Sequence, residues 1–191
     1  MLPQKAIVWK EMQALLISDP HFGKGAHFRK HGSYVPKNFF LHDLKMLEQM
    51  LLQIKPEKLL ILGDMFHSEF NEECLAFFRM IHQFKELQTI LIKGNHDILP
   101  KEFYLNWDID VVQKFDYENI SLTHEPHSGP QNDVLYNICG HIHPAIEISG
   151  RGKQTLKLPC YVFGKTQGIM PAFGSFKGNK IIKAQSGDRI F

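Results

Sequence analysis

Five segments of the chain each pass from an apolar run, typical of a buried strand, directly into aspartate, asparagine or histidine. They are Asp19-Pro20-His21, Gly63-Asp64, Gly94-Asn95-His96-Asp97, His124 and Gly140-His141-Ile142-His143. Ligands of an α/β sheet collect beyond the carboxyl ends of its strands, so we expect these side chains to lie close together. Carboxylate, imidazole and amide groups in this number indicate a centre for two metal ions.

The composition of this ligand set restricts the metal. The set contains no thiolate, which disfavours copper(I) and cysteine-rich structural zinc sites. Manganese, iron, cobalt, nickel and catalytic zinc stay open. A lone Asp-x-His or His-x-His is a weak signal, whereas their ordered combination with Gly-Asn-His-Asp is specific.

The same ordered motifs resemble those of the calcineurin-like metallophosphoesterases. The likeness is closest to the small bacterial DNA-ligase-associated phosphoesterase and endonuclease family, often called PdeM, and it spans nearly the whole chain. The segments that carry this closer likeness are Asp19-Pro20-His21-Phe22-Gly23-Lys24, Phe28-Arg29, Gly63-Asp64-Met65-Phe66-His67-Ser68, His124-Glu125-Pro126, Gly140-His141-Ile142-His143-Pro144 and Pro171-Ala172-Phe173-Gly174.

The resemblance implies a division of the ligands between two divalent ions, with manganese favoured. Asp19, His21 and His143 resemble the ligands of the first ion. Asn95, His124 and His141 resemble those of the second, and Asp64 resembles the bridge between them. Two metal ions held in this way activate a water for attack on phosphorus and stabilise the attacking and leaving oxygens.

His96 has no place in that ligand set. We expect it to donate a proton or a hydrogen bond to the leaving oxygen, with Asp97 holding its ring in orientation. The alternative is a structural residue of the turn.

Substrate contacts are predicted from two further segments. The basic stretch 21–32 lacks a hydrophobic period and is predicted to be a loop, in which Lys24 and Arg29 grip phosphate; a solvated loop is the alternative. His67 is expected to contact substrate or support a metal ligand, unless it is an ordinary surface histidine.

Weaker support for DNA binding comes from four other side chains. Arg151 and Lys153 add local positive charge. Phe22 and Phe28 could stack on bases, although core packing explains them equally well.

The first half of the chain reads as alternating strands and helices. Strand-like runs at 6–9 and 14–17 predict an antiparallel hairpin. Further strands are expected at 58–62 and 89–92, with amphipathic helices at 38–54 and about 71–87. This order predicts βαβ units and a parallel sheet.

The second half contains short strand candidates without a long helix, so we expect a partner sheet there. The resemblance implies an α/β fold with two packed mixed β-sheets flanked by helices, a four-layer αββα sandwich. No repeat or linker is visible, so residues 1–191 are predicted to form a single metallophosphoesterase domain.

Composition excludes several classes of protein. Of 191 residues 43% are hydrophobic, which argues against disorder. The net charge is only +2, so DNA binding would require local clusters of charge. The three cysteines are expected to be buried free thiols. No signal peptide or membrane span is evident, and we expect a soluble cytoplasmic protein without membrane contact.

These observations lead to a first hypothesis and two alternatives. The first is a manganese-dependent endonuclease for single-stranded DNA. The resemblance also suggests a setting in DNA repair, beside a ligase and a helicase-like protein. The second is a phosphoesterase for cyclic nucleotides, nucleotides or phosphomonoesters. A non-catalytic scaffold is disfavoured because every candidate ligand and His96 are present.

Overall fold

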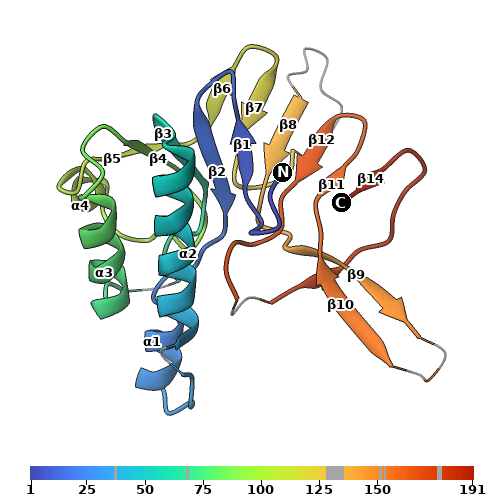
Figure 1. Ribbon diagram of the computed structural model, residues 1–191, viewed down its shortest axis with the longest axis horizontal. Helices are drawn as coiled ribbons and strands as arrows, with labels where there is room; N and C mark the ends of the chain where they lie inside the picture. The colour runs from blue at the N-terminus through green and yellow to red at the C-terminus, as the bar shows by residue number, and fades with distance from the viewer. Residues whose placement is uncertain (37, 68, 128–135, 151, 153, 176–177) are drawn as a thin grey trace.

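The computed structural model describes residues 1–191 except 37, 68, 128–135, 151, 153 and 176–177 (Figure 1). A five-stranded sheet has the order β1-β2-β3-β4-β5. Its first pair is the expected antiparallel hairpin, and β2 to β5 run parallel. The strands are β1 (Ile7–Trp9), β2 (Ala14–Ser18), β3 (Lys58–Leu62), β4 (Gln88–Ile92) and β5 (Ile109–Val112).

A second, six-stranded sheet has the order β14-β11-β12-β8-β7-β6 and mixes parallel with antiparallel pairs. Its strands are β6 (Phe115–Tyr117), β7 (Ile120–Leu122), β8 (Tyr136–Cys139), β11 (Val162–Phe163), β12 (Gln167–Ile169) and β14 (Arg189–Ile190). A separate three-stranded sheet contains β9 (Pro144–Ser149), β10 (Thr155–Pro159) and β13 (Lys180–Ile181). The expectation of two packed mixed sheets is confirmed, and this small third sheet is additional.

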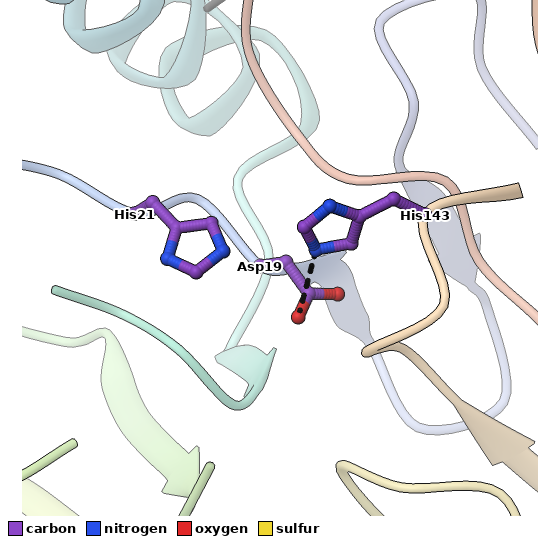
Figure 2. A group of neighbouring side chains, drawn as sticks. All are labelled: Asp19, His21 and His143. Carbon is purple, nitrogen blue, oxygen red and sulfur yellow. Dashed lines mark ion pairs between the residues drawn. The ribbon is translucent and has the colours of Figure 1, made fainter. Parts of the chain in front are cut away.

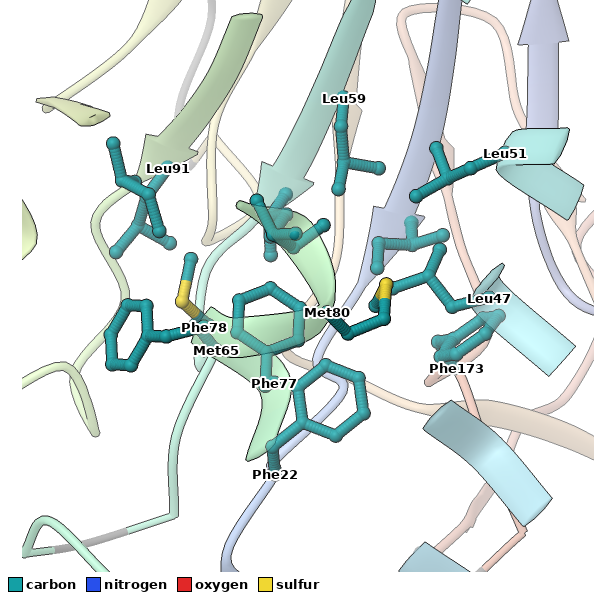
Figure 3. Close-up of a cluster of buried hydrophobic side chains, with 14 of the residues drawn as sticks. Phe22, Leu47, Leu51, Leu59, Met65, Phe77, Phe78, Met80, Leu91 and Phe173 are labelled. Carbon is teal, nitrogen blue, oxygen red and sulfur yellow. The ribbon is translucent and has the colours of Figure 1, made fainter. Parts of the chain in front are cut away.

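Side-chain alternation along the strands divides the core into two parts. Leu15 and Ile17 of β2 point to the helices, where they join a cluster with Leu47 and Phe77 (Figure 3). The intervening Leu16 faces the six-stranded sheet within a second cluster of apolar side chains. Strands buried on both faces read as continuous apolar runs, which explains why they were recognisable.

The helices are α1 (Lys24–Lys30), α2 (Asn38–Ile54), α3 (Glu72–Ile81) and α4 (Lys101–Leu105). Helices α2, α3 and α4 all contribute side chains to the core on the outer face of the five-stranded sheet. No helix of the described residues covers the outer face of the six-stranded sheet (Figure 1). The described part of the chain therefore forms three of the four layers that the family resemblance implies.

Three sequence expectations need correction. The stretch 24–30 is the helix α1 and not a loop; it contains no buried residue, so it carries no apolar period. Helix α3 ends at Ile81, short of residue 87, although Phe84 still packs against the core. Strand β5 joins the first sheet, whereas we expected all strands beyond residue 97 in the partner sheet.

Two further observations concern the cysteines and the lengths of the helices. All three cysteines are buried free thiols, as expected. None of the helices in the described ranges is both long and apolar enough to cross a bilayer.

Candidate metal centre

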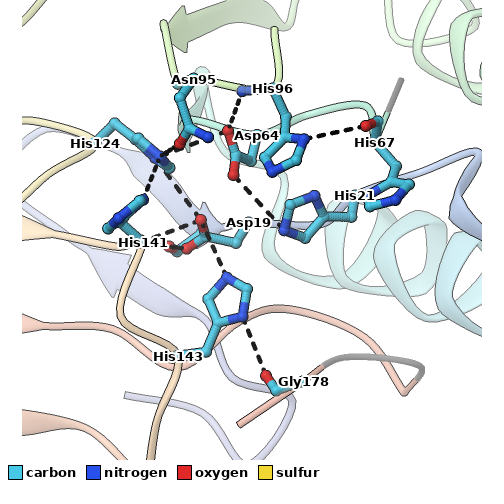
Figure 4. A network of polar contacts seen from close by, with 12 residues as sticks. Asp19, His21, Asp64, His67, Asn95, His96, His124, His141, His143 and Gly178 are labelled. Atoms are coloured by element: carbon cyan, nitrogen blue, oxygen red, sulfur yellow. Dashed lines mark hydrogen bonds and ion pairs between the residues drawn. The ribbon is translucent and has the colours of Figure 1, made fainter. Parts of the chain in front are cut away.

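Strand register brings the five sequence motifs to one edge of the structure. Ser18 of β2, Leu62 of β3 and Ile92 of β4 are level with one another in parallel ladders. In the six-stranded sheet, β7 and β8 are also parallel, with Leu122 level with Ile138. The residues that follow these strand ends therefore converge. Figure 4 shows them together: Asp19, His21, Asp64, Asn95, His96, His124, His141 and His143.

The backbone at this edge is strained. Five predicted ligands adopt left-handed conformations, which side chains other than glycine rarely occupy. They are Asp19 (φ 48°), His21 (φ 41°), Asp64 (φ 49°), His141 (φ 64°) and His143 (φ 51°). Such conformations cost on the order of 1–3 kcal/mol each and cluster at functional sites, where the surrounding structure fixes them.

One group of potential ligands consists of Asp19, His21 and His143 (Figure 2), and one ligand atom of each lies within 4.8 Å of the others. Asp19 is fully buried, and its Oδ1 lies 3.3 Å from Nε2 of His143. The Ser18 hydroxyl donates a hydrogen bond to the other carboxylate oxygen. Three residues from two separate segments can thus hold one cation.

A second group consists of Asp64, His124 and His141, again with ligand atoms within 4.8 Å of one another. Nε2 of His124 lies 3.1 Å from Nδ1 of His141 and 3.5 Å from Oδ1 of Asp64. Oδ1 of Asn95 is 3.0 Å from the same His124 nitrogen. The amide oxygen is therefore placed as a fourth potential ligand.

Asp64 lies between the two groups. One carboxylate oxygen is near His124, while the other is 3.7 Å from Nε2 of His21 in the first group. Burial raises the pKa of Asp64, and a hydrogen bond from the His96 backbone N–H (2.9 Å) acts in the opposite direction. This position fits the bridging role that the resemblance implies.

Hydrogen bonds from two histidine rings test whether cations fit here. Nδ1 of His124 is 3.1 Å from the Leu62 carbonyl oxygen, and Nδ1 of His143 is 3.1 Å from that of Gly178. A carbonyl only accepts, so each Nδ1 is the donor, and each Nε2 faces the cluster, where it could coordinate a cation. At His143 the Nε2 atom lies 3.3 Å from Oδ1 of Asp19, and the hydrogen bond from its Nδ1 to a backbone carbonyl is the arrangement common among metal-bound histidines.

Two glycines leave the space that the cluster needs. A Cβ at Gly63, whose φ is 77°, would collide with the His124 ring. A Cβ at Gly140 would collide with the Ser18 hydroxyl and the Asp19 carboxylate. The glycines of Gly-Asp and Gly-His-x-His are thus required by close approach of the ligands.

The structure assigns Asp97 a different partner from the one expected. Its carboxylate is 1% exposed and accepts backbone N–H groups from Asp64, Met65 and Gly94 at 2.8–2.9 Å. Burial raises its pKa to about 6 despite these bonds. The His96 ring is instead oriented by the His67 carbonyl oxygen, 3.2 Å from Nδ1. Asp97 joins two loops and does not orient His96.

The two basic side chains predicted to bind phosphate, Lys24 and Arg29, have different environments. Lys24 lines a cavity with His21 and Gly23, and burial lowers the pKa of its amine. Arg29 contacts Glu73 at 2.5 Å and donates to the Val35 carbonyl oxygen at 3.0 Å. The guanidinium is thus engaged within the protein, which weakens the prediction that it grips phosphate. Arg151 and Lys153 lie outside the described residues.

His67 lies beside the candidate metal centre. Its ring stacks on His96 with centroids 5.3 Å apart and an interplanar angle of 17°, and it meets the His21 ring at 5.5 Å. The sequence alone did not indicate that the Leu62, His67 and Gly178 carbonyls orient histidines. Backbone carbonyls occur at every position, so no residue type could have marked them.

Comparison with known proteins identifies the family. The family model for calcineurin-like phosphoesterases matches residues 12–160. The chain belongs to the calcineurin-like phosphoesterase family. Together with the two ligand groups, this membership makes it a metal-dependent hydrolase of phosphoesters. Members of the family use divalent metals, and the donor set described above suits them.

Three solved structures are similar to this calcineurin-like phosphoesterase. The nuclease MPE of Pseudomonas putida is 32% identical, with a TM-score of 0.82 over 100% of this chain and 89% of that one. A protein of unknown function from Aquifex aeolicus is 22% identical (TM-score 0.47; 68% and 78% covered). The phosphoesterase Yfce of E. coli is 17% identical (TM-score 0.46; 86% and 82% covered). A search of curated proteins gave no match.

Proposed function

We propose that this phosphoesterase is a nuclease that cleaves phosphodiester bonds of DNA, with single strands preferred and manganese as the favoured metal. The observation that carries the proposal is the convergence of two ligand groups around Asp64. Similarity over the full chain to a nuclease supports the substrate class.

The residues divide into three roles. Asp19, His21 and His143 would hold one ion, Asn95, His124 and His141 the other, and Asp64 both. When bound, two such ions supply Lewis-acid chemistry and lower the pKa of a coordinated water.

His96 is the residue for proton transfer. With Nδ1 donating to the His67 carbonyl oxygen, the imidazolium form of the ring would donate its Nε2 proton to the leaving oxygen. The stacked His67 ring limits rotation of the His96 side chain. Asp97 fixes the turn that carries His96 through its three backbone hydrogen bonds, so it acts by positioning.

A phosphoesterase for nucleotides or other small esters is the second candidate. Two observations favour it. The net charge of +2 gives little overall attraction for a DNA backbone, and the contact with Glu73 engages Arg29, one of the side chains predicted to bind phosphate.

One purified preparation can separate the two candidates. We expect a circular single strand to be cut with manganese, compared with zinc, iron, cobalt and nickel, and duplex DNA to be cut more slowly. EDTA and the Asp64→Asn variant should abolish cleavage. Hydrolysis of generic phosphate esters with the circle left intact under every metal would contradict the nuclease.

The family resemblance also suggests a cellular setting. We propose that the protein acts in the cytoplasm, in DNA repair beside a ligase and a helicase-like protein. Co-purification from cells would test this, and the absence of both enzymes after crosslinking would count against it.

A further inference from the structure

A row of aromatic rings extends from the candidate metal centre over α1. The His96 ring lies 5.3 Å from that of His21, and His67 stacks on His96 (Figure 4). Phe28 of α1 then stacks on His67, with centroids 5.8 Å apart and an interplanar angle of 20°. Three nearly parallel rings, Phe28, His67 and His96, thus follow one another away from the ligands.

The row continues along the helix. The His27 ring meets His67 at 5.3 Å and His31 at 4.4 Å. His31 is exposed, and His27, Phe28, His67 and His96 are half-buried. By contrast, Phe22 is 2% exposed and stacks on Phe77 in the core, so it is not available for substrate. We call His27, Phe28, His31, His67 and His96 the ring row.

Helix α1 contains no buried residue, and polar contacts connect it to neighbouring segments. Arg29 pairs with Glu73 of α3, and Lys30 lies 3.2 Å from Glu69. The Asn71 amide donates to the Gly23 carbonyl oxygen just before the helix. These contacts hold Phe28 and His27 against the loop that carries His67. Arg29 therefore serves the site through the placement of α1.

Phe28 and His96 cover the two faces of the His67 ring, so a further ring can join this stack only at an end. We propose that a nucleobase of the substrate strand, next to the phosphodiester that is cut, packs against the ring row at its Phe28 end. This rests on the proposed nuclease function and concerns substrate choice. Every base has a π-face, so aromatic rings bind single strands without sequence preference. A base within a duplex is paired and stacked and cannot reach such a row. The row therefore accounts for a preference for single strands without any added positive charge.

The test uses short single strands in which every linkage but one is made resistant to hydrolysis. The nucleotides flanking that linkage carry either bases or abasic tetrahydrofuran residues. Wild type is compared with Phe28→Leu, and with Phe191→Leu as a matched control, since Phe191 is an aromatic residue exposed at the C-terminus. Comparing both enzymes on both strands isolates the ring–base contact.

We expect wild-type kcat/KM to fall about 5- to 150-fold when the bases are removed. Phe28→Leu should show a similar fall on the strand with bases, and less than about twofold further loss on the abasic strand. Phe191→Leu should match wild type on both.

Equal effects of Phe28→Leu on both strands would overturn the proposal, since damage to folding or to the metal centre is common to the two substrates. Failure of wild type to cut any strand would instead reject the nuclease function itself, so the two failures are distinguishable.

Discussion

The two large sheets supply different halves of the candidate metal centre. The three buried carboxylates at this edge, Asp19, Asp64 and Asp97, follow β2, β3 and β4 of the five-stranded sheet. The six-stranded sheet supplies His124 after β7 and the His141–His143 pair after β8. His21 is the one predicted imidazole ligand from the first sheet.

Neither sheet alone provides a favourable environment for its part of the site. In the carboxylate half, burial raises the pKa of Asp97, and the neighbouring Asp64 raises it further. In the imidazole half, His124 depends on the Leu62 carbonyl of the opposite sheet for its orientation. The site is therefore a product of sheet packing, and each half can be disturbed separately.

The largest effect is expected at Asp64, which contacts both ligand groups. Asp64→Asn should lower kcat/KM by about 10⁴-fold or more. The reason is that the variant should lose bound metal, and each ion is expected to stabilise the charge of the transition state by several kcal/mol. Metal content, measured by mass spectrometry of the dialysed protein, should fall together with activity. Full activity with two bound ions would show that Asp64 does not link the halves.

A substitution at His96 can distinguish loss of catalysis from loss of metal binding. His96→Ala should reduce kcat by about 10²–10⁴-fold while both ions remain bound, since the ring is expected to transfer a proton and not to ligate. The reduction should shrink for substrates with better leaving groups, such as nitrophenyl esters. An equal reduction for good and poor leaving groups would assign His96 a structural role.

Asp97 tests the carboxylate half as a folding element. Asp97→Asn leaves backbone N–H groups facing an amide, which should lower the free energy of unfolding by about 1–3 kcal/mol. That corresponds to a fall in Tm of about 2–12 °C, measured in EDTA to exclude metal effects. The exposed Asp110→Asn is the control, with an expected change within about 0.5 kcal/mol. Equal Tm values for the two variants would contradict the positioning role.

The smallest effect concerns Arg29. Arg29→Gln should lower the free energy of unfolding by about 1 kcal/mol through loss of the Glu73 contact. The slope of log affinity for DNA against log salt concentration should not change. A slope reduced by about one would instead restore the original hypothesis that Arg29 contacts phosphate.

Much of the first half was predictable because its strands are buried on both faces. The runs at β2, β3 and β4 are continuous and apolar, and α2 has the expected bounds, Asn38–Ile54. Helix α1 was missed because its stability comes from polar contacts such as Arg29–Glu73, which leave no periodic signal.

The candidate site was predictable as a set of residues and not as a network. Residue types and order indicated which side chains gather. The use of Asp97 by three backbone N–H groups was not predictable, because it depends on the path of two loops 32–33 residues apart in sequence. The stacking of Phe28 on His67 has the same origin, since the rings come from segments that meet only after folding.

We expect the two sheets together to hold two metal ions. Anomalous scattering from crystals grown with manganese would locate them. We predict two peaks, one among Asp19, His21 and His143 and one among Asn95, His124 and His141, with Asp64 beside both. A single peak, or peaks away from these side chains, would contradict the account.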